Sequence, residues 1–128
     1  MTSPVLQRWI EIVDSGRIDG LEALLAEDAV FFSPAVLRPQ EGRAQVVAYL
    51  AAALKLFGDS GFHYVEQWHG ERSAILEFEA DVAGIYVNGI DMLHWNDDGQ
   101  IVSVKVMIRP VKALQAIIPK MAELLSQS

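Results

Sequence analysis

One carboxylate lies in the middle of an otherwise apolar stretch of the chain. Asp91 is flanked by isoleucine and methionine in the segment 87–96, away from the acidic turn at 97–98. A carboxyl group in apolar surroundings holds its proton more tightly, so it can donate a hydrogen bond or exchange a proton near neutral pH. Asp91 is therefore the first candidate for a catalytic acid or for a polar contact to a ligand.

Two other side chains could add polar groups to such a site. Trp9 lies on an amphipathic segment and carries an indole N–H, which is a hydrogen-bond donor only. Ser33 precedes Pro34 at the end of a short apolar run and carries a hydroxyl. Ser33 is not a general base at neutral pH without a partner histidine. Both could also be plain structural residues, Trp9 in the core and Ser33 in a turn.

The histidines do not form a convincing site. His63, His69 and His94 lack close ligand spacing, and the chain contains no cysteine. We expect neither a metal site nor a cofactor. A Ser–His–Asp arrangement of Ser33, a histidine and Asp91 is disfavoured, because His94 lies on the opposite strand face from Asp91.

Other charged residues are better explained as structural. Glu77, Glu79 and Asp81 alternate along one segment, as on a solvated or interfacial sheet face. Arg43 stands at the start of a predicted helix. Arg109 could lie at a pocket rim or pair with an acid, and a structural role is favoured.

Composition excludes several classes of partner. The chain has 128 residues, which is about one domain, and we predict a single domain over 1–128. Its net charge is −7 and it has no cluster of Lys and Arg, which disfavours nucleic acid and anionic membranes as partners. The N-terminal segment lacks the features of a signal peptide and the chain lacks cysteine, so we expect a cytoplasmic protein.

The periodicity of the apolar residues changes from helical to alternating in the second half. Ser3 is a candidate N-cap, Pro4 a first helical residue and Gly16 a stop signal, and Pro119 should kink or break the last helix. The pattern predicts helices over 3–15, 19–26, 42–57 and 110–125, and strands over 28–33, 62–69, 72–83, 85–96 and 100–109.

This order of elements predicts an α+β fold in which helices pack on one face of an antiparallel sheet. Apolar residues also occur on the presumed outer face, and a monomer would expose them as one patch. We therefore expect a homodimer through that face, whose apolar residues are Ile75, Ile90, Met92, Ile101 and Met107.

Four stretches, in this order, resemble one known superfamily: "RWIEIVDSGRIDGLEALLAEDAVFFSP", "EGRAQVVAYL", "GIDMLHWNDDGQI" and "VMIRPVKAL". The sequence resembles the NTF2-like superfamily, which includes SnoaL-like proteins, ketosteroid isomerases and limonene-epoxide hydrolases. The resemblance implies a cystatin-like curved sheet, with three N-terminal helices enclosing a pocket and a further C-terminal helix. This superfamily hosts many functions, so the resemblance alone does not assign one.

The resemblance to ketosteroid isomerases can be followed residue by residue. That family uses a tyrosine, a general-base aspartate and a protonated aspartate, and the matching positions here are Trp9, Ser33 and Asp91. One of the three groups is therefore present, and we expect no ketosteroid isomerase activity. The Asp–Arg–Asp relay of limonene-epoxide hydrolases is also poorly matched, because Asp91 has no evident second aspartate and Arg109 is the only late arginine.

The sequence therefore predicts a mostly apolar pocket with one carboxyl, one hydroxyl and one indole, which suits a small apolar molecule that carries a polar group. Two functions stay open: a cofactor-free isomerase, cyclase or hydrolase that uses Asp91, and a non-catalytic module for small-molecule binding or dimerisation. The expected lining residues are Trp9, Val13, Phe31, Ser33, Val36, Tyr49, Phe57, Leu76, Phe78, Val87, Asp91, Leu93, Val104, Val106 and Ile108.

Overall fold

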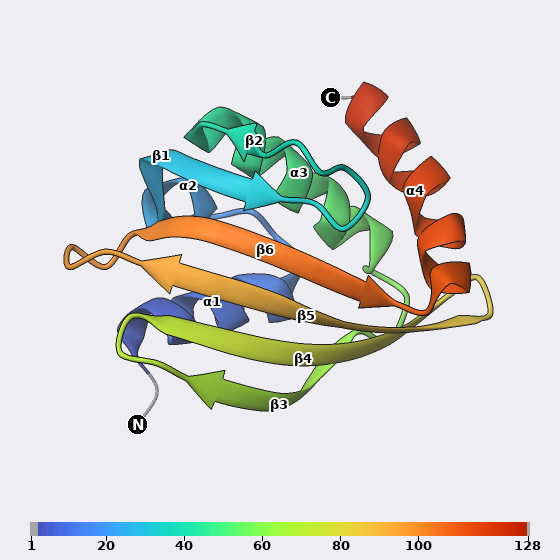
Figure 1. The fold of residues 1–128 in the computed structure, drawn as a ribbon, viewed down its shortest axis with the longest axis horizontal. Helices are drawn as coiled ribbons and strands as arrows, with labels where there is room; N and C mark the ends of the chain where they lie inside the picture. The colour runs from blue at the N-terminus through green and yellow to red at the C-terminus, as the bar shows by residue number, and fades with distance from the viewer. Residues whose placement is uncertain (1–2, 128) are drawn as a thin grey trace.

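The computed structural model describes residues 3–127, which form a mixed α+β fold around one curved sheet (Figure 1). The α+β prediction is confirmed. No helix within this range is long and apolar enough to span a membrane.

The helices and strands follow one another along the chain in this order: α1 (Pro4–Ser15), α2 (Leu21–Leu24), β1 (Leu25–Phe32), β2 (Gln40–Glu41), α3 (Arg43–Leu56), β3 (His63–His69), β4 (Ser73–Val82), β5 (Ile85–Trp95), β6 (Ile101–Arg109) and α4 (Val111–Ser126).

The sheet has six strands in the order β2-β1-β6-β5-β4-β3. Strands β3 to β6 form the antiparallel meander that the alternating pattern predicts. Strand β1 joins this meander in parallel to β6, with Phe31 opposite Val104. The sequence analysis missed both this parallel pairing and the two-residue strand β2. A parallel neighbour needs a long crossover, and local sequence signals do not report one.

Helix α1 begins and ends where its capping residues predict. The Ser3 hydroxyl accepts a hydrogen bond from the Leu6 backbone N–H, and Pro4 takes the first helical position. Gly16 closes the helix with φ of 69°, a conformation that costs glycine little. Leu6, Trp9 and Ile12 are buried, so this face of α1 packs under the sheet.

The predicted helix over 19–26 is wrong in its bounds. The helix has only four residues, Leu21–Leu24, and the residue at its N-cap is Gly20. Leu25 already belongs to β1, where it pairs with Ile101 of β6. Burial of Leu25 in the sheet therefore overrides the helical spacing of the leucines.

Pro119 was expected to kink or break the last helix, and it does not break it. Helix α4 runs through Pro119 from Val111 to Ser126. Pro119 and Gln115 are both exposed, so the Gln115 carbonyl that loses its helical donor remains accessible to water. Ala113 and Ile117, before Pro119, are buried on the opposite side of the helix, and Met121, after it, is half-buried against the same core cluster.

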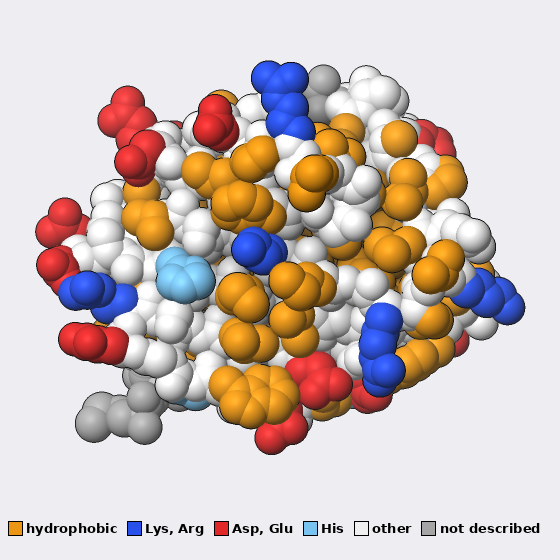
Figure 2. Space-filling model, viewed as in Figure 1, with side chains coloured by type: hydrophobic (Ala, Val, Ile, Leu, Met, Phe, Trp, Pro, Cys, Tyr) orange, Lys and Arg blue, Asp and Glu red, His pale blue; other side chains and the backbone are white. Residues whose placement is uncertain are grey.

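The outer face of the sheet carries apolar and polar groups in two regions (Figure 2). Ile75, Ile90 and Met92 are half-buried there, and Met107 is 49% exposed. Ile101 was expected on this face, but it is fully buried in the core, since the register shifts by one residue between His94 and Trp95.

A polar cluster occupies the other part of the outer face. Arg109 Nε donates a 2.7 Å hydrogen bond to Asn88 Oδ1, and Asn88 Nδ2 donates a 2.9 Å bond to Glu77 Oε2. Both Arg109 and Glu77 therefore have structural partners outside the cavity.

Candidate functional site

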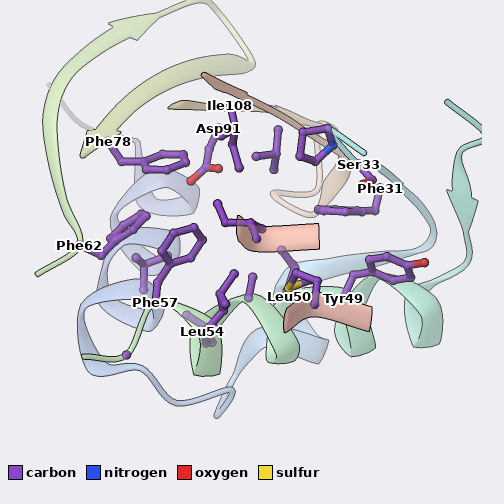
Figure 3. A pocket seen from close by; sticks show the side chains of 18 of the residues that line it. Phe31, Ser33, Tyr49, Leu50, Leu54, Phe57, Phe62, Phe78, Asp91 and Ile108 are labelled. Carbon is purple, nitrogen blue, oxygen red and sulfur yellow. The ribbon is translucent and has the colours of Figure 1, made fainter. Parts of the chain in front are cut away.

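A cavity of about 520 Å³ lies between the inner face of the sheet and helices α1, α3 and α4. Its walls are mostly aliphatic and aromatic side chains. Figure 3 shows Phe57, Phe62, Phe78 and Asp91 toward one end and Phe31, Ser33 and Tyr49 toward the other. A concave apolar space with few polar groups is the usual form of a small-molecule site.

Asp91 faces this cavity from the middle of β5. Only 7% of its surface is exposed. Its Oδ2 atom accepts a 2.6 Å hydrogen bond from the Tyr64 hydroxyl, and the same hydroxyl accepts a 3.0 Å bond from Trp9 Nε1. Three elements, α1, β3 and β5, are thus joined by one chain of hydrogen bonds. Trp9 reaches Asp91 through Tyr64 rather than directly.

Among residues 3–127, no side chain pairs with the second carboxylate oxygen of Asp91. Within this range, the hydrogen bond from Tyr64 is the single contact of this carboxyl with a donor, and no basic side chain forms an ion pair with it. In Figure 3 the carboxyl is turned into the cavity. One oxygen is therefore held by the protein and the other is available to a ligand.

Burial sets the protonation of this group. Desolvation raises the pKa of Asp91 from 3.8 to about 6, and the hydrogen bond from Tyr64 opposes part of that rise. Burial and the adjacent carboxyl of Asp91 also raise the pKa of Tyr64 well above its ordinary value, so this phenol stays protonated. Asp91 can consequently gain or lose a proton close to neutral pH, and Tyr64 remains a donor to it.

Aromatic rings form the cavity wall next to Asp91. The ring centroids of Phe57 and Phe62 are 5.2 Å apart, and those of Phe62 and Phe78 are 4.8 Å apart. The Phe78 ring fits because its cross-strand partner is Gly89, where a Cβ would lie 2.5 Å from Phe78 Cζ. The absence of a side chain at residue 89 thus sets the position of this ring.

The hydroxyl of Ser33 is used in a local turn. Its Oγ accepts a 3.0 Å hydrogen bond from the backbone N–H of Ala35, and the residue lies at the other end of the cavity from Phe57 and Phe62. Tyr49 packs its ring on Phe31, with centroids 5.3 Å apart. These residues shape the far end of the cavity and do not contact Asp91.

Most of the residues that the sequence suggested for the pocket line this cavity. They are Trp9, Val13, Phe31, Ser33, Val36, Tyr49, Phe57, Phe78, Asp91, Val106 and Ile108.

Four others do not line it: Leu76, Val87, Leu93 and Val104 are fully buried in the core. Leu76, Leu93 and Val104 pack with α1 and α2 residues at one end of the sheet, and Val87 packs with Ala113 of α4. Strand alternation placed all four on the inner face, but it does not tell how far the cavity extends along each strand.

The sequence analysis missed the contribution of α4 and of Tyr64. The α4 residues that line the cavity are Leu114, Ile117, Ile118, Met121, Ala122 and Leu125. Tyr64 in β3 has the same parity as Phe62, which precedes the strand and lines the cavity, and this signal could have placed the Tyr64 hydroxyl on the same face as Asp91. A tyrosine with that parity was the available clue to the hydrogen-bond chain.

No metal-binding cluster is found in the part of the chain that the structure describes. His63 lies near Glu79, His69 contacts Gln67, and the His94 ring lies 3.4 Å from the Ser103 hydroxyl. None of these histidines lines the cavity. A Ser33–His–Asp91 arrangement is therefore not formed.

The sequence was compared with models of known protein families. The family model of the SnoaL-like domain matches residues 6–104, which is most of the chain. The chain belongs to the SnoaL-like family. The matched range contains Trp9, Tyr64 and Asp91 and ends before α4, so the helix that closes the cavity lies outside the family model.

Solved structures show the same fold. A protein described as a steroid delta-isomerase from Pseudomonas aeruginosa is 37% identical, with 96% of this chain and 90% of that chain covered and a TM-score of 0.92. An uncharacterised protein with a cystatin-like fold from Silicibacter pomeroyi is 31% identical, with 94% and 84% covered and a TM-score of 0.87.

An NTF2-like protein of unknown function from Mesorhizobium loti is 20% identical, with 83% of this chain and 88% of that chain covered and a TM-score of 0.74. At this identity the likeness concerns the fold alone. The SnoaL-like assignment and the NTF2-like architecture expected from the sequence are both confirmed.

Proposed function

We propose that this SnoaL-like protein binds a small, mostly apolar molecule in the cavity, with Asp91 as its polar contact. The observation that carries the proposal is the pairing of a 520 Å³ apolar cavity with one buried carboxyl whose second oxygen is turned into it. Such an unpaired polar group in an apolar site is costly for the protein alone and is satisfied when a ligand brings the complementary group.

The same carboxyl could perform cofactor-free chemistry. A general acid or base works best when its pKa lies near the working pH, and the pKa of Asp91 is about 6. The Tyr64 hydroxyl fixes one carboxylate oxygen, which leaves the other to exchange a proton with a bound molecule. Isomerisation, cyclisation and hydrolysis each include such a proton transfer.

The similarity to a protein described as a steroid delta-isomerase makes ketosteroids one class to test. Steroid-, terpenoid- and polyketide-like molecules are the broader class that a mostly apolar cavity suits. We do not expect ketosteroid isomerisation itself, because Trp9 and Ser33 stand at two of the three positions that the resemblance assigns to its catalytic groups.

The alternative is a binding module without catalysis, and one observation favours it. Asp91 is the single buried carboxyl that lines the cavity among residues 3–127, and the other lining acid, Asp14, is exposed at the end of α1. Reactions that need an acid and a base together would lack one of the two groups. Binding requires only Asp91.

Binding is tested with Nile red, an uncharged fluorescent probe, and with a thermal-shift screen of steroids, terpenoids and aromatic ketones. Nile red fluorescence should rise with the wild type and fall when a hit displaces the probe. Ala53→Phe, which fills the cavity from α3, should weaken binding of the probe, whereas Ala44→Phe on the exposed side of α3 should not. Equal binding to both variants would place the ligand elsewhere and overturn the proposal.

Catalysis is tested on the hits from this screen. Each hit is incubated with wild type and with Asp91→Asn, and products are followed by liquid chromatography with mass spectrometry. Conversion by the wild type and its loss in Asp91→Asn would establish an enzyme. Binding without conversion of any hit, in both proteins, would favour the non-catalytic module.

A further inference from the structure

Among residues 3–127, the side chains that line the cavity include acidic groups and no basic ones. The ionisable side chains that line it are Asp14 from α1, Tyr49 from α3, Tyr64 from β3 and Asp91 from β5. No Lys, Arg or His is found among the described lining residues, and none of those from α4 is ionisable. An anionic ligand would therefore meet carboxylates without a compensating cation, and a cationic ligand would meet complementary charge.

Asp91 lacks a counter-charge of its own. The carboxyl is nine-tenths buried, and its hydrogen bond comes from a neutral phenol, that of Tyr64. A buried carboxylate is strongly stabilised by a cation that also donates hydrogen bonds to it. The second oxygen of Asp91 is turned into the cavity, so a ligand cation can reach it without any rearrangement of Tyr64.

The aromatic wall provides a second reason to expect a cation. Phe57, Phe62 and Phe78 lie on the side toward which the Asp91 carboxyl is turned (Figure 3). The centroids of Phe57 and Phe78 are 5.8 Å apart at an interplanar angle of 67°, so these two rings form a corner, whereas Phe62 and Phe78 are stacked at 28°. Aromatic rings attract a cation that lies over their faces, most strongly where water is excluded.

We propose that the preferred ligand is a hydrophobic amine whose protonated nitrogen pairs with Asp91 beside the rings of Phe57, Phe62 and Phe78. The apolar part of the molecule extends along the cavity toward Phe31 and Tyr49. This inference rests on the proposed function, since it specifies which polar group the apolar ligand presents to Asp91. It also predicts discrimination against carboxylic acids of the same shape.

Three probes of matched shape test the proposal by isothermal titration calorimetry at pH 7.5. They are 4-phenylbutylamine, 4-phenylbutan-1-ol and 4-phenylbutyrate, which differ in charge at one end. The amine should bind at least about tenfold more tightly than the alcohol, because a charge-assisted hydrogen bond exceeds a neutral one by about 1.4 kcal/mol or more. The acid should bind most weakly.

Two variants separate a specific pair from general attraction to an acidic protein. Asp91→Asn keeps the shape of the side chain and should abolish the preference for the amine over the alcohol. Asp98→Asn removes the same charge from the exposed β5–β6 turn and should leave the preference unchanged. Equal loss in both variants would mean that the net negative charge attracts the amine, which would overturn the proposal.

The preference for the amine over the alcohol is also measured as a function of pH. A role of Asp91 in packing alone would not make this preference depend on pH. The amine stays protonated from pH 5 to pH 8, whereas Asp91 takes up a proton as the pH falls through about 6. The preference for the amine should therefore decline toward pH 5 in the wild type. Asp14, at the cavity mouth, and the phenols of Tyr49 and Tyr64 are the other ionisable groups that face the cavity. Asp14→Asn should retain the decline.

The possible outcomes distinguish this inference from the proposed function. If the alcohol binds as tightly as the amine and loses affinity in Asp91→Asn, the ligand is neutral: the amine proposal fails and the proposed function stands. If none of the three probes binds while Nile red does, the amine proposal fails as well. If neither the probes nor Nile red binds in the cavity, the proposed function fails and this inference fails with it.

Discussion

The Tyr64 hydroxyl in β3 donates a 2.6 Å hydrogen bond to Asp91 Oδ2 in β5, and strand β4 lies between these two strands. This contact fixes one side of the carboxyl and leaves the other side turned into the cavity. Because the same hydroxyl accepts the indole N–H of Trp9, the position of Asp91 is tied to α1 as well as to the sheet.

Tyr64→Phe should raise the pKa of Asp91 above 6, because the hydrogen bond that lowers it is lost. The variant should also lose about 1–2 kcal/mol of stability, since Trp9 Nε1 and Asp91 Oδ2 each lose a partner. Carbon-13 NMR titration of the Asp91 carboxyl and urea unfolding measure the two effects.

Tyr86→Phe serves as the control for this change. Tyr86 is 50% exposed and donates to Glu79 on the outer face. Its substitution should alter neither the Asp91 titration nor the stability by much. An unchanged or lower Asp91 pKa in Tyr64→Phe would show that the hydrogen bond does not stabilise the charged carboxyl.

Gly89→Ala should destabilise the protein by about 1–3 kcal/mol, which is typical of overpacking. The new Cβ would lie 2.6 Å from the Met107 carbonyl oxygen, which is backbone, and 2.5 Å from the Phe78 ring. Displacement of that ring should also reduce ligand binding. Gly58→Ala meets its neighbours at 3.4 Å or more and should be tolerated, so thermal melts of the two variants check the account. Equal melting temperatures would contradict it.

We expect a homodimer that forms through the outer face of the sheet. Met107 is 49% exposed and Trp68 is 48% exposed, and Figure 2 shows apolar side chains gathered on this face. Symmetric pairing would cover them. Multi-angle light scattering at micromolar concentration should give the dimer mass for wild type and the monomer mass for Met107→Glu. Leu37→Glu, on an exposed loop, is the matched control. A monomeric wild type would disprove the expectation.

Ketosteroid isomerisation should be absent, or its rate should be at least about 10²-fold below that of ketosteroid isomerases. This is the usual loss of rate when a general base is missing. Ser33 has a hydroxyl engaged with Ala35, and the Trp9 indole N–H is engaged with Tyr64. The assay follows isomerisation of a 5-ene-3-ketosteroid. Activity in a Ser33→Asp, Trp9→Tyr double variant would support the residue matching, and family-like activity in the wild type would refute the prediction.

The sequence predicted the fold well where local signals agree with packing. The cap at Ser3, the stop at Gly16 and the alternation in β4 each describe an element that tertiary contacts also favour. The prediction was wrong where packing decides, because Leu25 enters β1 instead of extending a helix. There the burial of an apolar side chain outweighs the local preference.

The cavity was only partly predictable for a similar reason. Alternation assigns Asp91, Leu93 and Val104 to the same face, but Leu93 and Val104 are sealed in the core while Asp91 is open to the cavity. Which inner-face side chains are open to the cavity depends on where α1 ends and where α4 packs over the sheet. The strand sequences do not predict the positions of these helices. The contact between Tyr64 and Asp91 depends in turn on the order of the strands in the sheet.

Among residues 3–127, no basic side chain pairs with Asp91, which is a buried carboxyl in an apolar cavity. Its pKa in the folded protein is about 6, above the value of 3.8 that it has when exposed. The folded state therefore binds the proton more tightly than the unfolded chain. The resulting stabilisation is present in full below 3.8 and is lost as the pH rises through about 6.

The most direct test is the free energy of unfolding of wild type and Asp91→Asn by urea denaturation, from about pH 4 to pH 8. Wild type should lose stability relative to the variant across this range, by roughly 2 kcal/mol in total, and the difference should level off above about pH 7. Parallel curves, or a wild type that gains on Asp91→Asn as the pH rises, would mean that Asp91 is solvated or paired, and would contradict the account.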